Sequence, residues 1–156
     1  MHQQLIEEFH WIEASLRLDL ITADEVVGWA SERVAAADTK GLVLLAAMRK
    51  PVRRDDVTSS LRDIAASEHL SWPTDFEAGL TVARRVARRI VDGDLEPIDG
   101  ARMIWWKVCT WTPELRERLN QFVGLASEWE DSPAHRAEYD EDILEACEAL
   151  LRSAGD

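Results

Sequence analysis

Apolar residues recur every three or four positions along nearly the whole chain, and this spacing restricts the fold more than any other feature. The clearest stripe lies between 75 and 92, where the apolar residues share one side when successive residues are placed 100° apart. Its members are Phe76, Gly79, Leu80, Ala83, Val86, Ala87 and Ile90. No segment shows the strict alternation typical of a half-buried strand. The sequence therefore predicts an all-α protein.

Residues typical of helix starts and stops separate these stripes. Thr22 with Glu25, and Thr74 with Glu77, have the spacing of a capping box, in which two side chains satisfy free backbone N–H groups. Gly93 is typical of the residue that follows a helix. Further starts are expected at Asp55, Thr112-Pro113 and Ser132-Pro133.

The segments with helical spacing are joined by short connections, which favour an irregular or orthogonal bundle. We expect about seven helices in a single domain spanning residues 1–156, because a chain of this length buries enough surface for one core. Seven segments have helical spacing: 3–19, 23–37, 55–65, 75–92, 98–111, 113–129 and 133–153. Residues 41–48 are apolar without a clear period, and their Leu, Ala and Met residues favour a helix over a strand.

Composition limits the class of protein. With 46% hydrophobic residues the chain is too apolar for intrinsic disorder, and no apolar run approaches the roughly 20 residues of a membrane span. The acidic first twenty residues do not resemble a secretion signal, so we expect a cytoplasmic protein. Cys109 and Cys147 lie in helical patterns without metal-ligand spacing, which indicates small buried side chains rather than a zinc site or a disulfide.

The net charge of −12 is unevenly distributed along the sequence. Residues 1–48 carry −5, residues 49–92 carry +2, and residues 93–156 carry −9. Such a field repels phosphate backbones and speeds the encounter with basic proteins.

Four carboxylates of the last predicted helix face outward together, opposite the stripe of Ile143, Leu144, Cys147, Leu150 and Leu151. We call them the acidic face: Glu138, Glu141, Asp142 and Glu145. One interpretation is a solvated surface that promotes solubility, and the other is a docking surface for a basic partner.

Two further features lie beside this face. Trp129, among Glu128, Glu130 and Asp131, is predicted to be accessible and to recognise Lys or Arg through cation–π and ionic contacts. Arg136 and Asp140 are four residues apart on another stripe, and we predict a partly buried structural ion pair between them.

The other tryptophans that lie off the main stripes need a second packing surface, and for Trp11, Trp105 and Trp106 burial is favoured over an exposed patch. Arg84, Arg85, Arg88 and Arg89 form a ladder on the outer side of their helix. A nucleic-acid reader would use such a ladder, but the chain lacks a net basic surface, so we expect pairing with acidic neighbours and no nucleic-acid partner.

Enzyme signatures are absent from the sequence. The four histidines, His2, His10, His69 and His135, occur singly, without metal-ligand spacing, and no phosphate loop or nucleophile elbow is present. We therefore expect neither a bound metal nor a cofactor, although a helical enzyme can assemble a site from scattered residues.

Two segments carry a resemblance to known proteins: Gly100-Ala101-Arg102-Met103-Ile104-Trp105-Trp106, and the run from Phe122 to Asp131. They resemble uncharacterised bacterial helical proteins, some similar to immunity proteins encoded beside toxins. The resemblance covers the C-terminal third and implies stoichiometric inhibition of a toxin, without catalysis or cofactor. Because such proteins do not share one motif, the resemblance assigns no binding residues to this chain.

Three hypotheses for function follow. The first is a small acidic immunity protein whose carboxylates cover a basic toxin surface, with electrostatic steering speeding association. The second is a helical enzyme with a site between helices. The third is a housekeeping regulator or scaffold whose acidity only maintains solubility.

Overall fold

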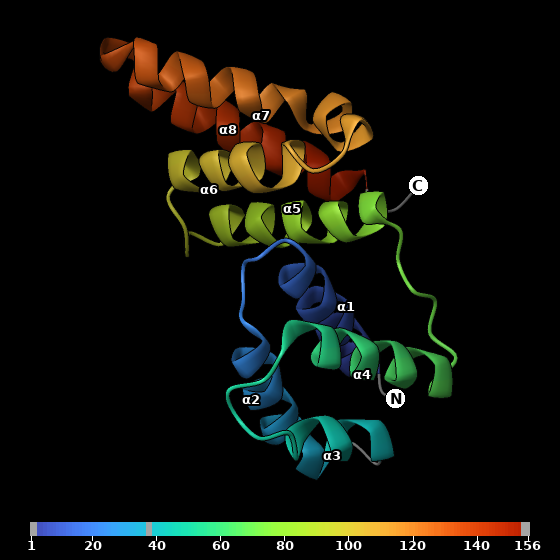
Figure 1. Cartoon of the computed structure of the whole chain (residues 1–156). Helices are drawn as coiled ribbons and strands as arrows, with labels where there is room; N and C mark the ends of the chain where they lie inside the picture. Colours follow the sequence, from blue (N-terminus) through green and yellow to red (C-terminus); the bar gives the residue numbers. More distant parts are fainter. Residues whose placement is uncertain (1–2, 37–38, 154–156) are drawn as a thin grey trace. The chain divides into compact units, whose positions relative to one another are not determined.

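A computed structural model describes residues 3–36 and 39–153 of the chain. Over these residues it contains helices and no strand, which confirms the predicted all-α class (Figure 1). The chain divides into two compact units, Met1–Thr74 and Asp75–Asp156. The expectation that both belong to one domain stays a prediction.

The described part of the first unit is built from four α-helices and a short 3₁₀ turn. In it, α3 packs against α2 and α4, and α1 packs against α2. The elements are α1 (Gln3–Arg17), α2 (Ala23–Arg33), the turn Val34–Ala36, α3 (Lys40–Ala46) and α4 (Arg54–Ser67). The predicted end of the second helix at Ala37 lies outside the described residues.

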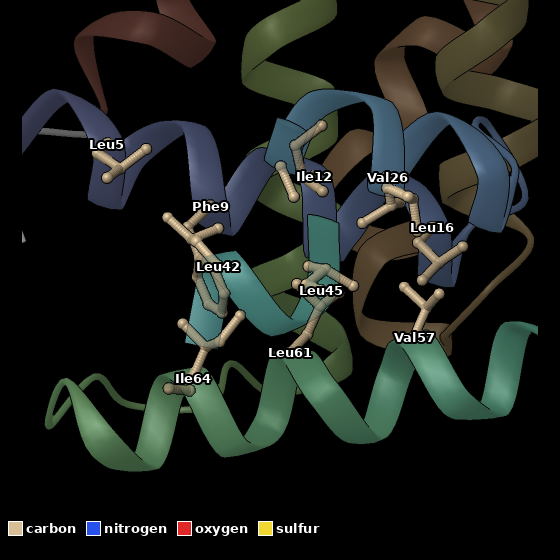
Figure 2. Close-up of a cluster of buried hydrophobic side chains, with 13 residues drawn as sticks. Leu5, Phe9, Ile12, Leu16, Val26, Leu42, Leu45, Val57, Leu61 and Ile64 are labelled. Carbon is tan, nitrogen blue, oxygen red and sulfur yellow. The ribbon is translucent and has the colours of Figure 1, made fainter. Parts of the chain in front are cut away.

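The core of the first unit gathers the apolar stripes of all four helices (Figure 2). Phe9 of α1, Leu42 of α3 and Ile64 of α4 are almost completely buried there. Trp11, Trp29 and Trp72 pack partly buried against this core, so the predicted burial of Trp11 is confirmed in part. Each buried large apolar side chain contributes about 1.5–3 kcal/mol to folding.

Local chemistry explains where these helices begin. The Thr22 hydroxyl accepts a hydrogen bond from Glu25 N, and the Glu25 carboxylate accepts one from Thr22 N at 2.7 Å, so the predicted capping box is confirmed. The hydrogen bonds that Thr22 N and Thr22 Oγ1 donate to the Glu25 carboxylate lower the pKa of Glu25. The predicted start at Asp55 is wrong. Helix α4 begins at Arg54, and Asp55 lies in its first turn. There the positive end of the helix dipole stabilises the negative charge of its carboxylate.

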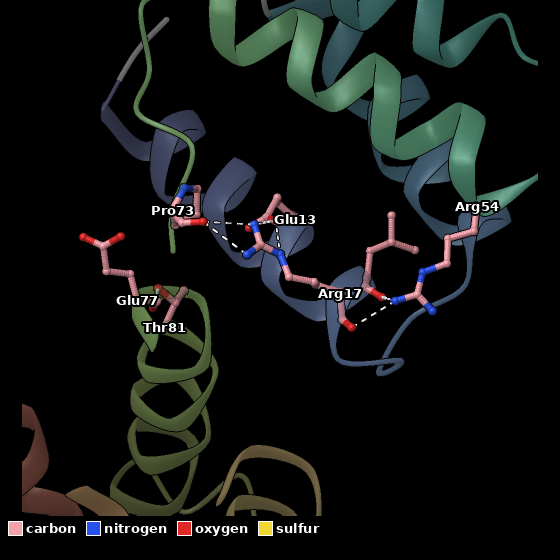
Figure 3. A network of polar contacts seen from close by, with 7 residues as sticks. Glu13, Arg17, Arg54, Pro73, Glu77 and Thr81 are labelled. Carbon is pink, nitrogen blue, oxygen red and sulfur yellow. Dashed lines mark hydrogen bonds and ion pairs between the residues drawn. The ribbon is translucent and has the colours of Figure 1, made fainter. Parts of the chain in front are cut away.

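Arginine side chains hold the end of the first unit in place (Figure 3). Arg17 forms an ion pair with Glu13, a carboxylate only 3% exposed, and also donates to the carbonyl oxygen of Pro73 at 3.1 Å. The guanidinium groups of Arg17 and Arg62 each lie 5.3 Å from the ring of Trp72. The segment that follows α4 is therefore attached to α1 and α4 by polar and cation–π contacts.

Over its described residues the second unit contains four α-helices, a π-helical segment and a 3₁₀ turn. In it, α8 packs against α5, α6 and α7, and the π-helix packs against α5, α6 and α7. The elements are α5 (Asp75–Val91), α6 (Pro97–Met103), the π-helix Ile104–Cys109, α7 (Pro113–Asp131), the 3₁₀ turn Pro133–His135 and α8 (Arg136–Arg152).

Most predicted boundaries in the second unit agree with the structure. Gly93 follows α5 with a φ of 78°, a conformation that glycine adopts without strain, and Thr112 caps α7 by accepting from Leu115 N at 3.2 Å. Ser132 makes no such bond, so its predicted capping role is wrong: a 3₁₀ turn occupies 133–135 and α8 starts at Arg136. The predicted helix 98–111 changes to π geometry from Ile104 onward.

Candidate functional site

The acidic face lies on the exposed side of α8, where the periodicity places it. Its four carboxylates are exposed, and the opposite side of the helix is buried through Ile143, Ala146, Cys147 and Leu150. The structure therefore places Glu138, Glu141, Asp142 and Glu145 in the arrangement that the sequence predicts.

These carboxylates differ in their partners. Glu138 Oε2 lies 3.2 Å from His135 Nδ1, and this contact becomes an ion pair when the imidazole is protonated. Across the part of the chain that the structure describes, no basic group forms an ion pair with Glu141, Asp142 or Glu145. Their negative charge is therefore directed to solvent without local neutralisation.

The neighbouring segment 128–131 forms the last turn of α7. Glu128, Glu130 and Asp131 are exposed, and Trp129 is half-buried. Glu130 accepts hydrogen bonds from Arg102 of α6 at 2.9 Å. The Trp129 ring lies 4.0 Å from the Arg136 guanidinium and 5.4 Å from that of Arg102. The cation–π chemistry expected of Trp129 is thus already used within the chain, and its role toward a partner stays a prediction.

The predicted ion pair between Arg136 and Asp140 does not form among the described residues. Asp140 Oδ1 instead accepts a hydrogen bond from Trp129 Nε1 at 3.0 Å, and Arg136 Nε donates to the carbonyl of Trp129 at 3.4 Å. Two causes explain the correction. An arginine four residues before an acid is the weaker orientation on a helix. Arg136 is also exposed in the first turn, where its side chain reaches back over the indole ring.

A groove between α7 and α8 borders the acidic face. It has a volume of about 810 Å³ and is open to solvent. Asp142 and Glu145 belong both to the acidic face and to this groove. The complete lining is Gln121, Gly124, Leu125, Asp142, Glu145, Ala146, Glu148, Ala149 and Arg152.

Sequence reasoning missed this groove, because a groove between two helices depends on which helices become neighbours. Gly124 is the one signal that could have pointed to it. A side-chain-free residue on the outer side of a helix leaves a gap, and a Cβ atom built there would meet nothing within 4 Å.

The tryptophan predictions fail at one position. Trp105 is half-buried, whereas Trp106 is 55% exposed, so its predicted burial is wrong. Trp106 lies off the main stripe, and no described element covers it as the second packing surface that its burial needs.

The arginine ladder on α5 also differs from expectation. Arg85, Arg88 and Arg89 are exposed and Arg84 is half-buried. Within the described part of the chain, Arg84, Arg88 and Arg89 form no ion pair with a carboxylate, so the predicted acidic pairing is wrong for these three. The positions one turn away from Arg84 hold no acid. Asp92 is one turn after Arg88 and Arg89, but it lies beyond the end of α5 at Val91.

Both cysteines are buried, as the sequence predicts. Removal from water raises the pKa of Cys109 to about 11 and that of Cys147 to about 12. Of the histidines, His10 is half-buried and His69 and His135 are exposed, and His2 lies outside the described residues. The described His, Cys, Asp and Glu side chains form no group of three that could hold a metal ion.

No described helix is long and apolar enough to cross a membrane. Comparison with family models, with curated proteins and with solved structures gave no match to this chain.

Proposed function

We propose that this chain is a cytoplasmic protein-binding protein of the immunity type, which inhibits a bacterial toxin stoichiometrically by covering a basic surface of that toxin. The observation that carries the proposal is that Glu141, Asp142 and Glu145 are exposed and, among the described residues, unpaired. All three are exposed on α8, and none has a basic partner in the described part of the chain. A basic protein surface supplies the counter-charge that the chain itself does not.

The charge distribution supports the same partner chemistry. Residues 93–156 carry a net charge of −9, and α8 contributes six carboxylates against two arginines. Such a field steers a basic protein toward this unit and raises the association rate at low ionic strength. A nuclease whose active site binds phosphates would present the complementary surface.

The test uses the product of the gene next to the one that encodes this chain. Co-expression should restore growth to cells that the neighbouring product poisons, and calorimetry should show binding of one molecule to one. A neighbouring product that is harmless, or that shows no binding at micromolar concentration, would overturn the proposal.

A matched pair of triple variants tests the role of α8. The first variant is Glu141→Gln, Asp142→Asn and Glu145→Gln, and we expect its association rate to fall by about tenfold at low salt. The control is Asp56→Asn, Asp63→Asn and Glu117→Gln, which changes the net charge equally at exposed positions that likewise lack ion pairs. Equal losses in the two variants would mean that only the net charge matters and would contradict docking at α8.

A further inference from the structure

The groove between α7 and α8 combines an apolar floor with acidic walls. Leu125 of α7 is half-buried, Ala146 of α8 is 7% exposed, and the Ala149 methyl group continues the same surface. Asp142, Glu145 and Glu148 stand along the α8 side of the groove. An apolar strip next to a row of carboxylates matches a partner segment that has both apolar and basic side chains.

The charge of the groove indicates which kind of molecule can occupy it. Its only base, among the residues that line it, is Arg152, which lies 3.5 Å from Glu148. Asp142 and Glu145 remain without a cation among the described residues. A second copy of this chain would present like charge, and a nucleic acid or an anionic membrane would be repelled. A positively charged polypeptide is the complementary occupant.

The shape of the groove favours a helix over an extended peptide. Helices lack free backbone N–H and C=O groups along their sides, so a groove between helices offers no strand edge for an extended chain to pair with. A helix can instead lie along α7 and α8, and the groove is open at Gly124, where an added Cβ would meet nothing within 4 Å.

We infer that this groove is a docking site for a basic amphipathic helix of a partner protein. The apolar side of that helix contacts Leu125, Ala146 and Ala149, and its lysines or arginines contact Asp142 and Glu145. The inference rests on the proposed function, and it assigns the contact to a groove rather than to the whole acidic face.

The direct test measures binding of a synthetic peptide and needs no toxin. The probe is a fluorescent peptide of about 18 residues, five turns of helix, with Leu on one side and Lys on the other. A peptide of the same composition in scrambled order carries equal charge without an apolar side. We expect the amphipathic peptide to bind the full chain at least about tenfold more tightly than the scrambled one. Equal affinities would overturn the inference.

Gly124 provides the steric test. Gly124→Trp should fill the groove and weaken binding of the amphipathic peptide by about tenfold or more. Gly124→Ala adds a single methyl group in open space and should leave the affinity within about twofold of wild type. Circular dichroism and melting temperature establish that both variants fold. A folded Gly124→Trp variant that binds like wild type would overturn the inference.

Two double variants with the same charge change separate the groove from the rest of the acidic face. Asp142→Asn with Glu145→Gln removes two carboxylates that line the groove, and Glu138→Gln with Glu141→Gln removes two that do not. The first should weaken peptide binding by about tenfold and the second by less than about threefold. A similar loss in both would contradict the groove.

The failure of this inference can be distinguished from failure of the proposed function. A neighbouring toxin that binds wild type and Gly124→Trp equally well supports the function and overturns the groove. A neighbouring gene product that does not bind, together with peptide binding that Gly124→Trp abolishes, overturns the toxin assignment and supports the groove.

Discussion

The indole Nε1 of Trp129 donates a hydrogen bond to Asp140 Oδ1 at 3.0 Å, and this contact joins the last turn of α7 to the second turn of α8. The guanidinium of Arg136 lies 4.0 Å from the same ring. Trp129 therefore contacts both Asp140 and Arg136, which the sequence predicts to form an ion pair with each other. The contact links α7 and α8 beside the acidic face.

A double-mutant cycle measures this contact. Trp129→Phe keeps an aromatic ring under Arg136 but removes the donor, and Asp140→Ala removes the acceptor. Because hydrogen bonds to charged groups stabilise more than neutral ones and this site is half-buried, we expect a coupling free energy of about 1 kcal/mol in urea unfolding. Single-variant effects that add to within about 0.3 kcal/mol would show that the contact contributes nothing.

The two threonine or serine residues before proline give a matched test of helix capping. Thr112 accepts a hydrogen bond from Leu115 N, whereas Ser132 makes no capping bond. Thr112→Ala should therefore lower the free energy of unfolding by about 1 kcal/mol, and Ser132→Ala should change it by less than about 0.5 kcal/mol. Chemical denaturation of both variants measures the difference. Equal losses would contradict the assigned caps.

Features that depend on a few neighbouring residues could be predicted from the sequence. The capping box of Thr22 and Glu25, the stop at Gly93 and the buried stripe of α5 each need only local spacing. The π-helix Ile104–Cys109 could not be predicted this way, because it arises where α6 and α7 pack around it. The exposure of Trp106 also depends on tertiary packing, because only another element could cover a side chain that lies off the main stripe.

In the candidate site, too, local spacing predicts some features, whereas others depend on tertiary packing. Helical periodicity alone places Glu138, Glu141 and Asp142 on the outer side of α8, and the structure agrees. The partners of Arg136 and Asp140 were beyond sequence reasoning, because Trp129 competes for both from another helix. The groove was also out of reach, since its two sides belong to helices whose adjacency no local pattern specifies.

The buried thiols give a prediction about pH. Burial raises the pKa of Cys147 to about 12 from the ordinary 9.0, so the folded state favours the neutral thiol. This contribution to stability is present below about pH 9 and is lost as the pH rises toward 12. Cys109, with its pKa raised to about 11, acts in the same direction.

Thiol labelling checks the burial directly. At about pH 8 the folded chain should not react with Ellman's reagent over minutes, because the thiolate is the nucleophile, and both cysteines should react in urea. Cys147→Ser should remove part of the loss of stability at alkaline pH. Rapid labelling of Cys147 in the folded state would contradict its burial.

The last prediction concerns the stability of the acidic face. Like charges lie three or four residues apart at 138/141, 138/142, 141/145 and 142/145, and each contact destabilises a helix by about 0.2–0.5 kcal/mol. Replacing Glu138, Glu141 and Glu145 by Gln and Asp142 by Asn removes all four contacts. Near the start of α8 the helix dipole stabilises Glu138, and its loss offsets part of the gain. We expect the free energy of unfolding to stay the same or rise by up to about 1 kcal/mol at low salt.

Ionic strength and a second variant show whether this explanation is right. The gain should shrink as salt approaches 1 M, where the Debye length is about 3 Å and exposed charges are screened. Glu148 differs from the acidic face because it has a basic partner, Arg152, at 3.5 Å. Glu148→Gln should therefore leave stability unchanged or lower it by less than about 0.5 kcal/mol. A large loss of stability in the variant with all four carboxylates replaced would mean that these side chains are paired within the folded chain. The acidic face would then not be free to receive a basic partner.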